Sequence, residues 1–129
     1  MKTARRILLT LLSLVITVTV MAQTTIHTTA SIIADWNETT ENWDWRSEWK
    51  EQNINFLLQG NVVLVNDKAN STYTMLKDPE VRNNYFEWEA IDESRIDCTF
   101  MMTDEADENN YGYIMVMYSD RLFKYVYKL

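Results

Sequence analysis

Residues 86–102 read FEWEAIDESRIDCTFMM, and apolar side chains recur at every second position on each side of a polar centre. The apolar set consists of Phe86, Trp88, Ala90, Ile96, Cys98, Phe100 and Met102. A period of two is typical of a half-buried β-strand. Asp92-Glu93-Ser94 between the two halves predicts a short hairpin turn. We therefore expect two antiparallel strands that place Cys98 on their apolar face.

The same organisation extends to both sides of this hairpin. Apolar runs at residues 54–58 and 62–65 are separated by Gln59-Gly60-Asn61, and the Gly-Asn pair predicts a second hairpin. Further strands are predicted at residues 72–76, 111–118 and 121–129. Short connections join these segments, whereas parallel pairing requires crossovers of a dozen or more residues. The pattern therefore predicts an antiparallel meander.

The fold class predicted for the chain is all-β, an up-and-down meander of about 7–8 strands. Such a meander forms either a small barrel or a strongly twisted open sheet. The chain of 129 residues contains only two glycines. Barrel corners usually require glycines or bulges, so the open sheet stays an alternative. We expect asparagine to replace glycine in part of the turns, because asparagine tolerates the left-handed conformation.

Residues 1–22 are predicted to be a signal peptide. Lys2, Arg5 and Arg6 precede an apolar run at residues 7–20, which is shorter than a bilayer span, and Ala22 suits cleavage. An uncleaved membrane anchor is the alternative. The expected product is exported to the periplasm or secreted, and does not insert into a membrane. Within it, we expect residues 23–42 to be a flexible arm or an edge strand, and residues 43–129 to be the meander domain.

The charge of the mature chain limits its partners. Three of the twelve basic residues precede residue 23 and all nineteen acidic residues follow it, which leaves a formal charge of −10. Nucleic acids and anionic lipid surfaces require clusters of Lys and Arg. These two classes of partner are therefore not expected. The single cysteine excludes an intrachain disulfide and leaves burial or an intermolecular bridge for Cys98.

The sequence predicts no catalytic, cofactor or metal site, and we expect the protein not to be an enzyme. His27 is the only histidine and has no second histidine or suitably placed cysteine to complete a transition-metal site. Glu87 and Glu89 lie on one strand face at a spacing of roughly 7 Å, which a glycosidase pair could use. Alternating glutamates more often mark the solvent face of a strand. The acidic residues 104–110 lack the EF-hand spacing and are expected to form a solvated hairpin tip.

The aromatic residues are expected mainly to fill the core and support the sheet, and a binding surface is the alternative. Five Trp, seven Tyr and four Phe all lie in the mature chain. We expect a strand, or alternatively a helical turn, from about Trp43 to Trp49. Trp43, Trp45 and Trp49 form the candidate binding surface for another protein or a neutral glycan. Tyr111, Tyr113, Tyr125 and Tyr127 lie on neighbouring strands and predict cross-strand aromatic ladders.

The junction Val20-Met21-Ala22-Gln23, the Trp-rich segment and the Tyr-rich strand at residues 118–129 resemble small exported proteins of unknown function from Bacteroidota. In strand count the meander resembles the calycins. The lipocalin signature Gly-x-Trp is absent, because Trp36 follows Ala34-Asp35. The resemblance covers about residues 43–129, and no functional residue can be carried over from it.

We therefore expect an exported binding or structural module whose most favoured role is interaction with a protein or with the cell envelope. The alternatives are a lipocalin-like carrier of a small apolar ligand and a glycan-binding module. Glycoside processing through Glu87 and Glu89 is the remaining enzymatic hypothesis. An apolar interior cavity of at least about 300 Å³ favours the carrier, whereas exposed tryptophans favour the interaction module. The pattern leaves the oligomeric state open.

Overall fold

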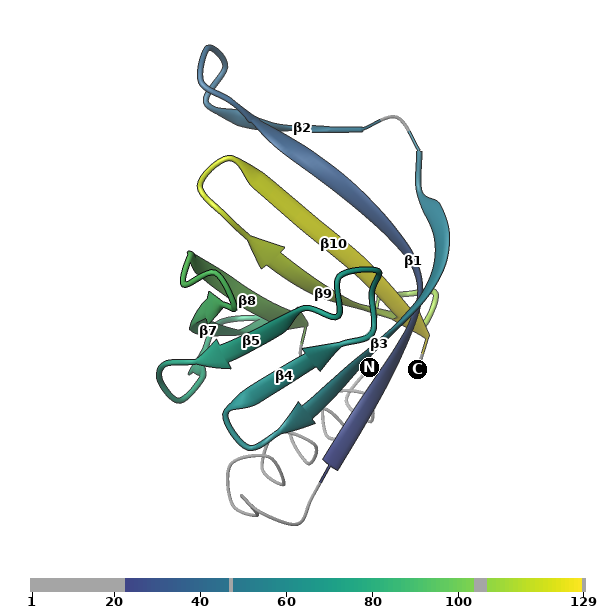
Figure 1. Cartoon of the computed structure of the whole chain (residues 1–129). Helices are drawn as coiled ribbons and strands as arrows, with labels where there is room; N and C mark the ends of the chain where they lie inside the picture. The colour runs from purple at the N-terminus through teal and green to yellow at the C-terminus, as the bar shows by residue number, and fades with distance from the viewer. Residues whose placement is uncertain (1–22, 47, 104–106, 129) are drawn as a thin grey trace.

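The computed structural model describes residues 23–46, 48–103 and 107–128. The regular secondary structure in these ranges consists of β-strands alone (Figure 1). The strands are β1 Gln23–Asn37, β2 Asn42–Trp45, β3 Lys50–Gln59, β4 Val62–Val65, β5 Thr72–Met75, β6 Glu80–Val81, β7 Tyr85–Asp92, β8 Asp97–Thr103, β9 Tyr111–Met117 and β10 Arg121–Lys128. Within these ranges no helix is long and apolar enough to cross a membrane. The predicted signal peptide, residues 1–22, lies outside the described residues.

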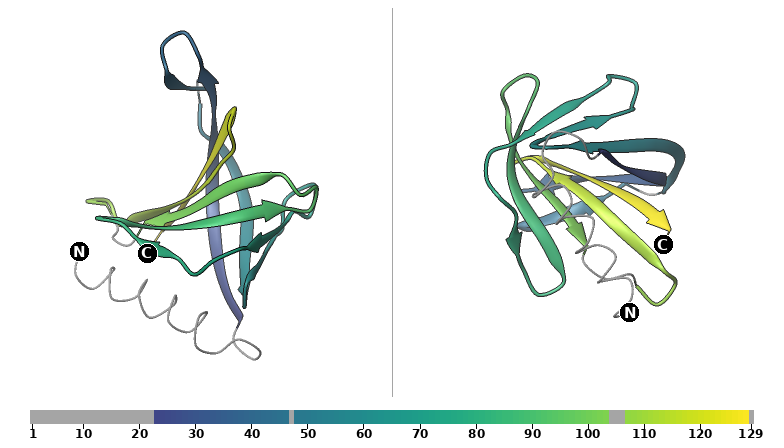
Figure 2. Two further views of the ribbon diagram at one scale, coloured as in Figure 1. Left: turned by 90° about the vertical axis from the view of Figure 1, so that its left-hand side faces the viewer. Right: turned by 90° about the horizontal axis from the view of Figure 1, so that it is seen from below.

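The strands form one antiparallel barrel. Their order is β10-β9-β8-β7-β5-β4-β3-β1, and β10 also pairs with β1, so that eight strands close on themselves (Figure 2, right). The short strand β6 pairs with β7, and β2 pairs with β1 beyond the end of β3. The all-β meander expected from the sequence is confirmed, and it is a closed barrel rather than an open sheet.

Closure depends on β1, which is the longest strand. Its first part pairs with β3, and its residues Ala30 to Asp35 pair with Val126 to Arg121 of β10. The register against β3 shifts between Thr28 and Ala30. A bulge of this kind bends a strand and increases its twist. The barrel thus obtains the curvature for closure at a position without glycine.

Aromatic rings fill the inside of the barrel. The Phe56 ring lies edge-on to Tyr125 with centroids 4.8 Å apart, and edge-on to Phe100 at 6.0 Å. Trp88 also contacts Phe100 edge-on at 6.2 Å. Cys98 is buried in the same cluster with 7% of its surface exposed, as its alternation predicted. Because edge-to-face packing fills space between rings, the interior is a packed core.

A second, smaller apolar cluster lies on the outer face of the barrel. Ala34, Met101 and Leu122 are buried there, and Phe100 and Met102 on either side of Met101 belong to the inner core. The side chains packed against them are Trp43, Tyr85, Met115 and Met117. We call these seven residues the outer cluster. It lies beside the β1–β2 hairpin and extends across β10, β9 and β8 to β7.

Three turns of the barrel are built in the same way around an aspartate. Asp67, Asp92 and Asp107 each accept hydrogen bonds through Oδ1 from the backbone N–H groups two and four residues later. The residue three positions after each aspartate has a positive φ: Asn70 at 49°, Arg95 at 63° and Asn110 at 63°. The expected use of asparagine in turns is confirmed at two of these sites. At Arg95 the aspartate cap imposes the left-handed conformation on an ordinary residue.

The structure corrects three expectations about local structure. Residues 23–37 form a barrel strand instead of a flexible arm or an edge strand, because β3 and β10 pair with its two edges. The strand expected at residues 43–49 ends at Trp45, and Trp49 lies in the connection to β3. The tyrosine ladder does not form, since Tyr125 and Tyr127 pair with Ile114 and Gly112, and their rings point inward.

Candidate functional site

The most prominent surface feature is the hairpin of residues 34–45, which projects beyond the barrel (Figures 1 and 2). We call it the tryptophan hairpin. Residues 34–37 of β1 pair with residues 42–45 of β2. Asn37 stabilises the turn, because its Oδ1 accepts hydrogen bonds from the backbone N–H groups of Thr39 at 3.0 Å and Thr40 at 3.2 Å. Glu41 completes the turn with a φ of 51°.

Three tryptophans lie on one face of this hairpin. Trp36 is paired with Trp43, and their rings meet edge-on with centroids 5.2 Å apart. Trp45 is paired with Ala34 and therefore projects from the same face. Trp36 is 38% exposed and Trp45 is 46% exposed, whereas Trp43 is half-buried as part of the outer cluster. The hairpin therefore presents an aromatic surface anchored at its centre by Trp43.

The sequence identified part of this surface and missed part of it. Of the three predicted residues, the hairpin brings Trp43 and Trp45 together, while Trp49 lies outside it and is 44% exposed. Trp36 was not predicted, because residues 23–42 carried no clear strand pattern. The missed signal is Asn37, which starts a turn between Trp36 and Trp43 and so makes them cross-strand partners.

Lys124 connects the tryptophan hairpin to the barrel wall. Its Nζ lies 5.5 Å from the centre of the Trp45 ring and 4.3 Å from the centre of the Tyr113 ring. Both distances allow cation–π attraction. Burial lowers the pKa of the Lys124 ammonium group, and the Asp107 carboxylate opposes this effect. The lysine thus extends the aromatic surface onto β9 and β10.

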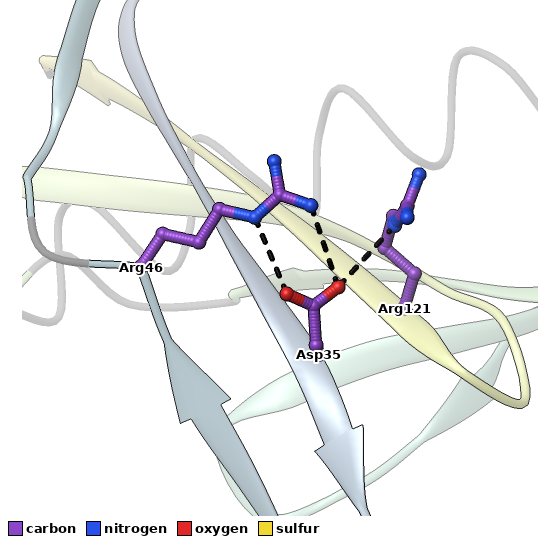
Figure 3. A network of polar contacts seen from close by, with 3 residues as sticks. All are labelled: Asp35, Arg46 and Arg121. Atoms are coloured by element: carbon purple, nitrogen blue, oxygen red, sulfur yellow. Dashed lines mark hydrogen bonds and ion pairs between the residues drawn. The ribbon is translucent and has the colours of Figure 1, made fainter.

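Ionic contacts hold the base of the hairpin (Figure 3). Arg46 contacts the Asp35 carboxylate through Nε at 3.3 Å and Nη2 at 3.5 Å, and Arg121 Nε approaches it to 3.5 Å. The hydrogen bonds from Arg46 are the main cause of the lowered pKa of Asp35. The Trp36 N–H also donates to the carbonyl oxygen of Asp120, at 3.0 Å. These contacts join the hairpin to the turn between β9 and β10.

The glutamate pair considered for catalysis is engaged with basic residues. Glu87 accepts a hydrogen bond from Arg82 Nε at 2.9 Å, and Glu89 lies 3.2 Å from Lys77 Nζ. Both carboxylates of this pair are therefore engaged in ion pairs with neighbouring side chains. His27 Nδ1 contacts Asn55 Oδ1 at 2.7 Å on the surface. In the described part of the chain no group of three His, Cys, Asp or Glu residues could hold a metal ion.

Two cavities lie at the ends of the barrel. The apolar one measures about 140 Å³ and is lined by residues that include Leu58, Val63, Met75, Trp88 and Phe100. Pockets for drug-sized ligands usually measure about 300–1,000 Å³. The other cavity measures about 380 Å³ and is polar. We call it the polar mouth; its lining includes Asp67, Asp92, Glu93, Asp120, Arg121 and Tyr125.

No protein-family model, curated protein or solved structure matches this chain.

Proposed function

We propose that this protein is an exported, non-enzymatic binding module that recognises a partner protein through the tryptophan hairpin. The observation that supports the proposal is the exposure of Trp36 and Trp45 on one face of a projecting hairpin. Tryptophan is enriched among the residues that dominate binding energy at protein interfaces. Its large ring contributes contact area at a small cost in conformational entropy.

The surroundings of the hairpin also support an interface. A stable protein–protein interface usually covers about 800 Å² on each partner. The face of the hairpin joins the outer cluster, whose Met115 and Met117 side chains are partly exposed. Methionine adapts its shape to a partner surface. Together these side chains form an apolar centre that is larger than the hairpin alone.

Acidic residues are frequent on and next to the hairpin, while Lys124 is the cation in contact with Trp45. Glu38, Glu41 and Asp44 are exposed on the hairpin, and Glu48 is exposed just after it. Opposite charges across an interface speed association and select the partner. The acidic margin therefore favours a partner with a basic rim around an apolar pocket. A neutral glycan lacks this Coulomb attraction, although its hydroxyl groups can donate hydrogen bonds to carboxylates.

The test compares matched variants in the cells that produce the protein. Native complexes are cross-linked and captured with the unmodified chain, with Trp36→Ala/Trp45→Ala, and with Tyr111→Ala as control. Tyr111 is an exposed aromatic residue on β9, outside the tryptophan hairpin. All three chains are first shown to unfold at similar temperatures. We expect one partner to be recovered with the unmodified chain and the control, and lost with the double variant.

Two results contradict the proposal. One is equal recovery of every cross-linked protein by the double variant and the unmodified chain. The other is saturable binding of a neutral oligosaccharide that quenches the tryptophan emission and is lost in the double variant. That second result assigns the same surface to a glycan.

A further inference from the structure

Three methionines of the outer cluster lie next to one another on β8 and β9. Met101 is paired directly with Met115, and Met117 is two residues further along β9 on the same face. In antiparallel strands, directly opposite side chains have Cβ atoms about 4.5–5.5 Å apart, and residues i and i+2 of a strand lie about 7 Å apart. Methionine has a long, unbranched side chain with three rotatable bonds. The three thioether sulfur atoms can therefore reach one common point outside the barrel wall.

This group contains most of the methionines of the barrel. Five methionines follow residue 22; Met102 lies in the inner core, and Met75 packs against that core. The other three point outward, although strands favour β-branched and aromatic residues. Met101 is 9% exposed, and Met115 and Met117 are half-buried. Leucine fills a similar volume, so packing alone does not require sulfur at these positions.

The thioether group determines which ligand such a cluster can bind. It is a soft, neutral donor, and soft sulfur ligands select Cu(I), whereas Mg²⁺ and Ca²⁺ prefer oxygen. Zn²⁺ sites are built from thiolate, imidazole and carboxylate groups. A thiol or an imidazolium group must lose a proton before it binds a metal, but a thioether has none to lose. Three converging thioethers therefore favour a soft, monovalent metal ion.

The groups around the three methionines also suit a monovalent cation. Trp43 packs against the same buried residues, and the face of an indole ring attracts cations where water is excluded. On the neighbouring strands, Glu87 is paired with Met101, and Lys124 is paired with Met115. The Lys124 ammonium group lies over two aromatic rings. The formal charges of the glutamate and the lysine cancel, so this pair does not repel a cation.

We propose that the three methionines of the outer cluster bind one Cu(I) ion through their thioether sulfur atoms and that Trp43 covers this ion. The ion binds and leaves as Cu(I), so no electron is transferred. Ag(I) has the same charge and the same preference for sulfur, and it occupies the same site. The site does not depend on a partner protein, because the two exposed tryptophans of the hairpin are not ligands.

The binding test titrates the full chain with Ag(I), and with Cu(I) kept reduced in the absence of oxygen. We expect saturable binding of one ion per chain, quenching of the tryptophan emission, and no competition from excess Zn²⁺. The affinity should be equal at about pH 5 and about pH 7.5, because protons compete for histidine and cysteine ligands but not for thioethers. The proposal is overturned if Cu(I) does not bind saturably or if Zn²⁺ displaces it. An affinity that falls at the lower pH also overturns the proposal and assigns the ion to His27 or Cys98.

Matched variants locate the bound ion. Replacing the three outer-cluster methionines by leucine removes their sulfur atoms with little change in volume and should abolish binding. Met75→Leu/Met102→Leu is the control, because it removes the other two methionine sulfur atoms after residue 22. The control should bind like the unmodified chain, and all three chains are first shown to unfold at similar temperatures. Equal affinity of the triple variant, or an equal loss in the control, overturns the proposal.

A measurement on the unmodified chain covers the case in which the triple variant does not fold. Peroxide converts methionine to its sulfoxide, and metal coordination withdraws the sulfur lone pair that peroxide attacks. Ag(I) should therefore slow the oxidation of the three outer-cluster methionines and leave that of Met75 unchanged, as measured by mass spectrometry of peptides. Equal oxidation of the outer cluster with and without Ag(I) overturns the proposal.

Discussion

Replacing Arg95 by glycine should stabilise the protein. Arg95 follows the turn of the β7–β8 hairpin, has a φ of 63° and is exposed. Its N–H donates to the carbonyl oxygen of Asp92 at 3.0 Å, so the aspartate cap keeps the backbone in this conformation. A residue with a Cβ pays roughly 1–2 kcal/mol in the left-handed region, and glycine avoids this cost.

The magnitude follows from two opposing effects. Substitution by glycine removes the steric cost of the positive φ. It also increases the backbone entropy of the unfolded chain, which lowers the free energy of unfolding by about 0.5–1 kcal/mol. The net gain in the free energy of unfolding should be about 0.5–1 kcal/mol. For a domain of this size that gain raises the melting temperature by about 2–8 °C. Asn70→Gly and Asn110→Gly should gain less, because asparagine tolerates a positive φ.

The assay is thermal and urea unfolding followed by circular dichroism and tryptophan fluorescence. Arg95→Ala is the matched control, because it removes the same side chain but keeps the Cβ. We expect the control to lie within about 0.5 kcal/mol of the unmodified protein. The reasoning is refuted if Arg95→Gly melts at or below the temperature of Arg95→Ala. It is also refuted if Asn70→Gly and Asn110→Gly raise the free energy of unfolding by more than Arg95→Gly does.

Three further predictions concern the core and the charged turns. A Cβ added at Gly112 would lie 2.6 Å from Cε2 of the buried Tyr127 ring. Gly112→Ala should therefore lower the free energy of unfolding by about 1–3 kcal/mol. The loss should be smaller in a Tyr127→Leu background, where the clashing ring is removed. Burial raises the pKa of Cys98 to about 11. Iodoacetamide at pH 8 should therefore label the unfolded chain but not the folded one. Rapid labelling of the native protein would contradict this prediction. Hydrogen bonds from Tyr111 N–H and Tyr113 Oη lower the pKa of Asp107, so folding loses this contribution as the pH falls below about 4. Asp107→Asn should therefore lose less stability than the unmodified protein between pH 5 and pH 2, and parallel losses contradict the assignment.

Local patterns of the sequence were sufficient to predict the β3–β4 and β7–β8 hairpins. Phe86 pairs with Met102 and Ala90 with Cys98, as the alternation predicts, because the strands are adjacent and one face is buried. The Gly60-Asn61 turn also forms where the pair predicts it, with a φ of 61° at Gly60. In both cases the partners lie close in sequence, so the turn and the period of two determine the register.

Pairing between distant segments could not be read from these patterns. Residues 23–37 are rich in threonine and alternate weakly, so nothing local shows that Ala30 to Asp35 pair with β10. The same reason hid Trp36 from the candidate surface. The polar mouth is assembled from three separate turns, and Tyr125 reaches it from the core. Such a cavity becomes visible only after the barrel is closed.

The most direct test of the proposed interaction surface replaces Trp45 by a photo-cross-linking phenylalanine derivative in the cells that produce the protein. The same substitution at Tyr111 is the control, because that residue is exposed outside the tryptophan hairpin. On illumination, we expect one defined protein adduct at position 45 and none at position 111. Adducts of equal yield and composition at the two positions, or no adduct at position 45, contradict the account.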